Sequence, residues 1–381
     1  MKKNWEFGVL GDAVDKGSSN ISLNKIQNDN GEFPVYGAKG FAKNISFYQQ
    51  ENKYLAIIKD GAGIGRISIH PEKSSVLATM QYIIPKQSYD IKFLYYFLNA
   101  VDFENYRMGS TIPHIYFKHY KSEPFPLINI EEQKQIVNKL DQVIAGIDKA
   151  KLNIEKNLKN AKELFQGKLN EIFSQKGEGW VEKKLGEITS KIGSGATPRG
   201  GQSSYKEFGI SLIRSLNVYD DGFREKKLAF IDNSQAQKLN NVAIESGDVL
   251  LNITGGSVAR CCIAPNDFLP ARVNQHVSII RLKGDAVSSE FLHYSLIAKI
   301  NKDLLLRIGE QGATRQAITK AQIENFIVSY PEDNKEQKQS VELIIRLKNQ
   351  TLSLESKYQQ ELNSLEELKK SILEKAFAGE L

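Results

Sequence analysis

The sequence repeats itself, and this duplication constrains the fold more than any other feature. Trp5 opens a W-x4-L-G motif that Trp180 opens again 175 residues later. Further pairs follow in the same order along the chain: Arg66 with Arg260, Gln81 with Gln275, and EQKQ at 132–135 with EQKQ at 336–339. The offset rises steadily to 204 residues. Ordered self-similarity at a long period predicts two copies of one structural unit, with insertions in the second.

A long amphipathic helix is predicted after each EQKQ motif. Apolar side chains recur there with alternating spacings of four and three residues, which is typical of a coiled-coil seam. The expected seam residues are Leu140, Val143, Ile147 and Ile154 in the first helix, and Ile344, Leu347, Leu354, Tyr358 and Leu365 in the second. A lone helix of about 40 residues, roughly 60 Å long, would leave this stripe in water. We therefore expect the two helices to pair antiparallel within the chain. The alternative is two independent coiled coils that dimerise with other chains.

The remainder of each copy mixes strand and helix patterns. Segments 54–59 and 67–69 are typical of strands around a glycine turn, and 91–101 is typical of a short helix packed on them. We expect an α+β protein in four parts: globular α/β domains at 1–128 and 177–330, and long spacer helices at 129–176 and 331–381 that form an antiparallel coiled coil. The copies would be related by a pseudo-twofold axis. We call the two globular domains head 1 (1–128) and head 2 (177–330), and expect them at opposite ends of the helical pair.

The charge distribution favours nucleic acid as the partner of the heads. Segments 1–128 and 179–330 carry net charges of +3 and +4, whereas 331–381 carries −2. The longest apolar run, at 93–98, is far too short to span a bilayer. Because the start of the chain also lacks the apolar stretch of a signal peptide, we expect a cytoplasmic protein with no membrane partner.

Motifs for catalysis and metal binding are not evident. DGAGIGR at 60–66 resembles a phosphate-binding loop, but a strand-like segment follows it where such a loop needs a helix, so we expect a glycine-bearing hairpin. The adjacent Cys261 and Cys262 and five scattered histidines lack metal-site spacing. We therefore expect no catalytic residue and no metal. One alternative is a stand-alone DNA nuclease or methyltransferase with an unrecognised active site, and another is a coiled-coil scaffold without nucleic acid.

The recurrent polar residues suit DNA recognition, because arginine and glutamine contact base edges, whereas lysine, serine and threonine position phosphates. The candidates shared by both copies are Arg66, Arg260, Gln81 and Gln275. Positions at which the copies differ are better candidates for reading sequence. In head 1 these are Tyr36, Lys39, Phe41, Lys43, Ser110, Thr111 and His114. In head 2 these are Thr197, Arg199, Gln202, Arg214, Asn217, Tyr219, Thr314 and Arg315.

Taken together, these motifs resemble the specificity (S) subunit of type I restriction–modification systems. The similarity covers essentially the whole chain. It rests on the two W-x4-L-G openings, SGATPRGG at 194–201, LLNITGGSVAR at 250–260, NQH at 274–276, and GATRQAI at 312–318 leading into EQKQ and a long helix. Head 1 departs from the pattern, since GSTIPHI at 109–115 lacks the arginine of GATRQAI.

The resemblance implies a function. Each head would be a target recognition domain that reads one half of a split, asymmetric DNA site, with the helices as a spacer. The subunit would be non-catalytic, and would bind double-stranded DNA and two methyltransferase (M) subunits. Subunits of this family also join restriction (R) subunits. No cofactor is then expected in this chain, because S-adenosylmethionine, ATP and Mg²⁺ would belong to the partner subunits.

Overall fold

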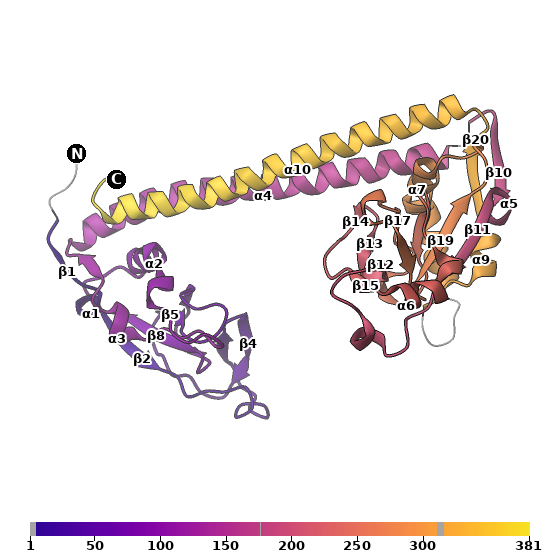
Figure 1. The fold of residues 1–381 in the computed structure, drawn as a ribbon. Helices are drawn as coiled ribbons and strands as arrows, with labels where there is room; N and C mark the ends of the chain where they lie inside the picture. Colours follow the sequence, from indigo (N-terminus) through magenta and orange to yellow (C-terminus); the bar gives the residue numbers. More distant parts are fainter. Residues whose placement is uncertain (1–4, 176, 311–315) are drawn as a thin grey trace. The chain divides into compact units, whose positions relative to one another are not determined.

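The protein is described here by a computed structural model, which covers residues 5–175, 177–310 and 316–381. It forms two compact units, one of Met1–Lys156 with Tyr358–Leu381 and the other of Asn157–Lys357. Each unit contains one head and a part of both long helices, α4 (Ile130–Ser174) and α10 (Asn334–Phe377) (Figure 1). The unit boundaries therefore cross both helices near their midpoints. Within the described residues, no helix is long and apolar enough to cross a membrane.

Head 1 is built around an antiparallel sheet with the strand order β2-β8-β5-β6. The strands are β2 (Val14–Ser18), β8 (Met80–Pro85), β5 (Tyr54–Ile58) and β6 (Ile67–His70). The central strand β5 is buried along its whole length because both of its faces are covered. Leu55 and Ile57 pack with Phe93 of helix α2 (Ile91–Ala100), whereas Tyr54 and the other alternate residues pack on the opposite face with Val76.

Smaller sheets complete head 1. One has the order β4-β3-β7, formed by β4 (Gly40–Ile45), β3 (Phe33–Gly37) and β7 (Ser75–Val76). The other pairs β1 (Phe7–Val9) with β9 (Pro124–Pro126), immediately before α4 begins. The strands and the helix expected at 54–59, 67–69 and 91–101 are thus confirmed.

Head 2 repeats this topology. Its main sheet has the order β11-β19-β16-β17, formed by β11 (Thr189–Ser194), β19 (Val277–Leu282), β16 (Val249–Asn252) and β17 (Cys261–Ile263). Helix α7 (Ser289–Ile297) contacts it as α2 contacts the sheet of head 1. A second sheet contains β15 (Ala229–Ile231), β12 (Ile210–Ile213) and β18 (Ala271–Val273). Strands β10 (Trp180–Lys184) and β20 (Ile327–Pro331) pair immediately before α10. The internal duplication is therefore structural as well as sequential.

The remaining elements are short and lie mostly in loops. Head 2 has a hairpin of β13 (Val218–Tyr219) and β14 (Gly222–Phe223). The other short α-helices are α1 (Leu10–Ala13), α3 (Phe117–Tyr120), α5 (Leu185–Ile188), α6 (Asn233–Lys238), α8 (Lys299–Glu310) and α9 (Lys320–Glu324). Helices α1 and α5 begin at the leucines of the two W-x4-L-G motifs, so this motif marks the same one-turn helix between two strands in both heads.

The two long helices pair antiparallel, as expected. In the first unit Lys151 forms an ion pair with Glu366, and in the second Lys162 forms one with Glu355 at 3.7 Å. A step of eleven residues forward along α4 is thus a step of eleven backward along α10. These exposed ion pairs define the register but contribute little stability. Buried apolar side chains hold the helices together: Leu140 and Ile144 with Leu373 and Phe377 in the first unit, and Leu169 and Phe173 with Val341 and Ile344 in the second.

Seven of the nine expected seam residues are buried or half-buried, and two are exposed. Leu140, Ile147 and Ile344 are buried, and Ile154, Leu347, Tyr358 and Leu365 are half-buried. The prediction is wrong for Val143 and Leu354, which are 40% and 41% exposed. Ile144 is buried in place of Val143. The reason is that α4 also packs on head 1, where Asp141 accepts hydrogen bonds from Tyr96 and Lys92 of α2. The buried stripe of α4 faces both α10 and head 1, and it therefore includes Ile144 rather than Val143.

Candidate nucleic-acid interface

Two recurrent loops of head 1 meet beside the end of β5. The glycine turn that follows β5 lies against the segment that contains GSTIPHI. The Gly61 N–H donates to the Pro113 carbonyl at 2.9 Å, and the Ile115 N–H donates to the Lys59 carbonyl at 2.9 Å. Segments about 50 residues apart in the sequence thereby form one surface.

The equivalent loops of head 2 meet through equivalent atoms. The Gly255 N–H donates to the Gln316 carbonyl at 2.9 Å, and the Ile318 N–H donates to the Ile253 carbonyl at 2.8 Å. Each of these residues is the counterpart of its head 1 partner at the offset found in the sequence. We call this arrangement the loop cluster of each head. Thr314 and Arg315, which were expected to contact DNA, lie outside the described residues.

The loop cluster of head 1 carries a charged network. The Asp60 carboxylate contacts His114 Nδ1 at 2.7 Å and Lys59 Nζ at 2.6 Å. Partial burial raises the pKa of Asp60, but hydrogen bonds from Lys59 and His114 outweigh it and hold the pKa below its ordinary value. Arg66 is exposed, and its guanidinium donates to the Ala38 carbonyl at 3.3 Å. It therefore ties the cluster to the β3–β4 hairpin.

That hairpin presents several of the expected DNA-binding side chains. Phe41 is 61% exposed, and Lys39 is exposed beside it at the turn. The Tyr36 ring lies 6.2 Å from that of Phe41. Lys43 differs from the others, because its ammonium donates to the Ile26 carbonyl at 2.8 Å and holds a neighbouring loop. The hairpin therefore offers one aromatic and one cationic side chain to a partner.

Ser110 and Thr111 belong to the second loop of the head 1 cluster, the one that contains GSTIPHI. Both are exposed, in the segment that leads to His114. Thr111 lines a surface hollow of about 500 Å³ together with Arg107 and Gly61. The hollow is therefore part of the same surface as the glycine turn.

In head 2 the loop cluster carries arginines stacked on a tyrosine. The guanidinium of Arg260 lies 4.7 Å from the centre of the Tyr219 ring, and that of Arg224 lies 5.2 Å from the same ring. Stacking of this kind restrains a guanidinium and leaves its N–H groups free to donate in the plane. Beside it, Thr197 hydrogen-bonds to Gln275, and Thr254 to His276.

The inserted segment of head 2 contributes further polar side chains. Arg199 and Gln202 are exposed on the loop that follows β11. The Arg214 guanidinium lies 5.2 Å from the centre of the Tyr205 ring and also donates to the Lys227 carbonyl. These residues remain candidates for base or phosphate contacts.

Two expected DNA-binding residues are buried instead. The side chain of Asn217 is fully buried, its Nδ2 donates to the Arg224 carbonyl at 2.8 Å, and its Oδ1 accepts from the Arg214 N–H at 3.1 Å. Gln81 is only 6% exposed and lies in β8, where its Oε1 accepts from the Tyr120 hydroxyl at 3.4 Å. Both side-chain amides form hydrogen bonds within the protein and are not available to DNA. The sequence pairing of Gln81 with Gln275 was therefore misleading, since Gln275 is exposed.

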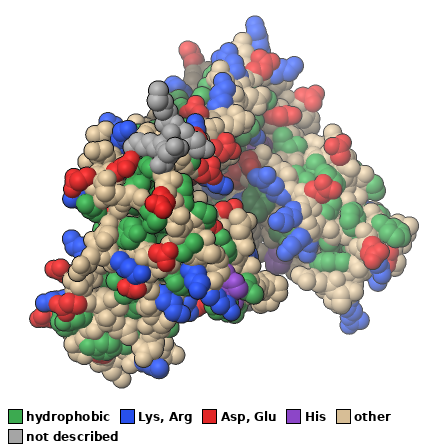
Figure 2. Space-filling view, turned by 90° about the vertical axis from the view of Figure 1, so that its left-hand side faces the viewer, with side chains coloured by type: hydrophobic (Ala, Val, Ile, Leu, Met, Phe, Trp, Pro, Cys, Tyr) green, Lys and Arg blue, Asp and Glu red, His purple; other side chains and the backbone are tan. Residues whose placement is uncertain are grey.

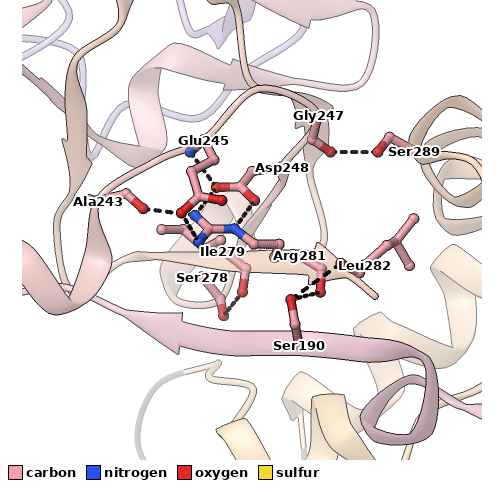
Figure 3. Close-up of polar contacts among 10 residues, drawn as sticks. All are labelled: Ser190, Ala243, Glu245, Gly247, Asp248, Ser278, Ile279, Arg281, Leu282 and Ser289. Atoms are coloured by element: carbon pink, nitrogen blue, oxygen red, sulfur yellow. Dashed lines mark hydrogen bonds and ion pairs between the residues drawn. The ribbon is translucent and has the colours of Figure 1, made fainter. Parts of the chain in front are cut away.

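A polar cluster in head 2, which the sequence patterns did not indicate, holds a loop against the main sheet (Figure 3). Arg281 of β19 forms two hydrogen bonds of 2.8 Å to the fully buried carboxylate of Asp248, contacts Glu245, and donates to the Ala243 carbonyl at 2.9 Å. The hydrogen bonds that Arg281 donates to the Asp248 carboxylate raise the pKa of Arg281. Both oxygens of Asp248 are committed, so this cluster holds a loop against the sheet. No spacing or motif indicates it, because Arg281 lies 33 to 38 residues from its partners in the sequence.

The described residues contain no group of three or more His, Cys, Asp or Glu side chains that could hold a metal ion. Cys261 and Cys262 are buried, and burial raises the pKa of both thiols, that of Cys262 to about 12. They are thus protonated packing residues at neutral pH.

On the face shown in Figure 2, lysine and arginine side chains gather next to a histidine.

Known proteins share both the sequence pattern and the fold. The chain matches the family described as type I restriction modification DNA specificity domain over residues 2–160 and 177–364. It is 26% identical to the type I restriction enzyme MjaVIII specificity subunit of Methanocaldococcus jannaschii over 287 residues, which cover 70% of this chain and 65% of that one. It is 24% identical to the EcoKI specificity subunit of Escherichia coli, over 95% of this chain and 82% of that one.

Solved structures agree at the level of the fold. A chain from a structural study of complex assembly and conformational transition in a type I R-M system aligns over 100% of both chains, with a TM-score of 0.76 and 18% identity. The crystal structure of the HsdS subunit from Thermoanaerobacter tengcongensis aligns over 100% of this chain and 98% of that one, with a TM-score of 0.58 and 18% identity. The chain spans about two thirds of the length of the M. jannaschii relative and 82% of the length of the E. coli relative. With two matching domains and the same fold, this chain belongs to the type I restriction modification DNA specificity family.

Proposed function

We propose that this chain is the DNA sequence-specificity subunit of a type I restriction–modification complex, with each head reading one half of a split, asymmetric site. The carrying observation is the loop cluster, which is built from the same backbone contacts in both heads but displays different side chains. Equivalent frames with unlike side chains are what two unlike half-sites require, because base identity is read by side chains and position by the frame.

The duplication also supports two methyltransferase subunits as partners. Two copies of one surface offer two quasi-equivalent docking sites. Several large apolar side chains on the long helices point into solvent, among them Leu152 at 66%, Leu164 at 65% and Leu352 at 51% exposed. Exposed apolar side chains of this kind could pack against a partner subunit. Restriction subunits would join the same complex in the cytoplasm.

Chemistry would then reside on the partners. The chain would be non-catalytic, and S-adenosylmethionine, ATP and Mg²⁺ would be bound by the methyltransferase and restriction subunits. In head 2 both oxygens of the buried Asp248 carboxylate accept hydrogen bonds from Arg281, so this carboxylate is already paired within the fold. Neither the matching family nor the similar proteins favour a stand-alone nuclease or methyltransferase.

The test is methylation profiling of the assembled complex on a randomised DNA library. The saturated complex should have a mass that corresponds to two methyltransferase subunits, and should methylate a split motif. Arg199→Ala or Arg260→Ala should cost about 1–3 kcal/mol of discrimination at one position of one half-site, if the arginine meets a guanine edge. Lys39→Ala should affect the other half-site alone, or weaken binding uniformly if Lys39 meets phosphate.

Arg346→Ala is the matched control, because Arg346 is an exposed arginine of α10 and belongs to none of the loops that form the clusters. Methylation by the chain alone, without partner subunits, would contradict the proposal. So would a substitution in one head that rewrites both halves of the motif.

A further inference from the structure

A buried glutamine joins head 1 to the start of α4. Gln133 is the second residue of the first EQKQ motif, and its side chain is fully buried although its neighbours in the motif are polar and largely exposed. Its Oε1 accepts from the Asp90 N–H at 2.8 Å, and its Nε2 donates to the Ser88 carbonyl at 3.1 Å and the Ile128 carbonyl at 2.9 Å. Asp90 is the N-cap of α2. One amide therefore links the long helix, the chain that enters it and the recognition domain.

The second copy repeats this linkage in head 2. Gln337 is 2% exposed, and its Oε1 accepts from the Ser288 N–H at 3.2 Å. Its Nε2 donates to the Ala286 carbonyl at 2.7 Å and the Pro331 carbonyl at 2.9 Å. Ser288 is the N-cap of α7, as Asp90 is of α2. These three bonds have their counterparts in head 1, and Gln337 Nε2 also donates to Asn334 Oδ1 at 3.3 Å.

The residue before each glutamine adds a second link. Trp5 Nε1 donates to the Glu132 carboxylate at 3.2 Å, and Trp180 Nε1 donates to that of Glu336 at 2.9 Å. We call the Trp, Glu and Gln of each copy its joint. The W-x4-L-G and EQKQ motifs that recur in the sequence thus supply the residues of the joints.

We infer that Gln133 and Gln337 are positioning residues that fix the orientation of each head on its long helix, and thereby the number of base pairs between the two half-sites. The inference rests on the proposed function. Adding one base pair to the gap moves a half-site by about 3.4 Å and turns it by about 35° around the DNA axis. A head on a loose joint would follow that movement, whereas a head held by three hydrogen bonds to one amide resists it.

The joint differs from an ordinary stability contact in what its loss changes. A residue that only stabilises the fold lowers binding at every gap by the same factor. A positioning residue changes the ratio between the cognate gap and its neighbours, and leaves the bases of each half-site as they were. The measurable quantity is therefore the ratio of methylation at the cognate gap to methylation at gaps one base pair longer and shorter.

The experiment uses the full complex with its methyltransferase subunits and a library of the cognate half-sites at stepped gaps. Gln133→Met and Gln337→Met keep the side-chain length and remove every hydrogen bond of the amide. Each should lower the ratio about tenfold, which corresponds to about 1.4 kcal/mol. Gln135→Met and Gln339→Met are matched controls, because these glutamines belong to the same motifs but are exposed. Both should retain the wild-type ratio.

A gentler variant covers the case in which the methionine variants do not fold. Tyr96→Phe removes only the hydroxyl that donates to Asp141 of α4 at 2.6 Å, so it loosens head 1 on its helix without leaving a buried polar group on the ring. It should lower the ratio in the same direction. An unchanged ratio in folded Gln133→Met, or in Tyr96→Phe if neither methionine variant folds, would overturn the inference. A wild-type complex that methylates an unsplit motif would instead overturn the proposed function.

Discussion

At the residue scale, two buried histidines make the stability of the heads depend on pH. Burial lowers the pKa of His70 in head 1 and of His293 in head 2 to about 4 each. Their ordinary value is about 6.5. Between these values the unfolded chain binds more protons than the folded one, so stability rises with pH. The contribution is complete above about pH 6.5 and is lost as the pH falls towards 4.

We predict that His70→Phe flattens this dependence for head 1. Phenylalanine keeps the ring stacked near Tyr54, now at 5.3 Å, but cannot bind a proton. The wild-type chain should lose on the order of 2 kcal/mol per histidine between pH 7 and pH 4.5. Urea midpoints at both pH values measure the effect, with His119→Gln as the control because His119 is exposed. Equal pH dependence in wild type and His70→Phe would show that His70 is not the titrating group.

At the element scale, the seam of the long helices is the feature to test. Leu140 and Ile144 are buried at 0% and 7% exposure, whereas Val143 between them is 40% exposed. Leu140→Asp or Ile144→Asp should destabilise the first unit by a few kcal/mol, because each buries an unpaired charge. Val143→Asp should cost less than about 1 kcal/mol. Thermal denaturation of the three variants decides between the two registers, and equal losses at Val143 and Ile144 would restore the register expected from sequence.

Leu347→Asp offers a test of the same seam in the second unit. Leu347 is half-buried, whereas Ile344 is 1% exposed. An intermediate loss is expected at Leu347, smaller than for Ile344→Asp. The difference in stability loss between the Leu347→Asp and Ile344→Asp variants therefore measures how steeply burial falls across this face of α10.

At the scale of the whole molecule, the length of the helical pair should set the gap between half-sites. Seven residues inserted after Lys156 in α4 and seven after Lys357 in α10 fall at the boundaries between the compact units, so neither unit is altered internally. A heptad lengthens each helix by about 10 Å, which is near three base pairs. Both half-sites should persist with a gap about three base pairs wider in the methylation profile. A heptad in one helix alone shifts the antiparallel register and should abolish methylation. An unchanged gap after the double insertion would show that the helices do not act as the spacer.

The sequence by itself determined the duplication, the two long helices and the family. These follow from patterns that are local or periodic: repeated motifs, heptad spacing and the strand–turn–strand pattern at 54–69. The helices expected at about 40 residues are Ile130–Ser174 and Asn334–Phe377. The division of the chain at 128, 176 and 330 stays a prediction, as do the contacts of individual side chains with DNA.

Only the tertiary structure decided which recurrent residues face solvent and which hold the fold. Steps of three and four residues both lie near one turn of a helix, so spacing alone could not choose between Val143 and Ile144; the packing of α4 on head 1 did. Gln81 and Asn217 are buried, and Gln275 is exposed, because of partners that lie far away in the sequence. Gln133 meets Asp90 across 43 residues and Gln337 meets Ser288 across 49. The sequence shows the same residue type whether a glutamine is exposed in a loop cluster or buried in a joint. The two roles differ in whether the fold supplies hydrogen-bond partners for the side chain.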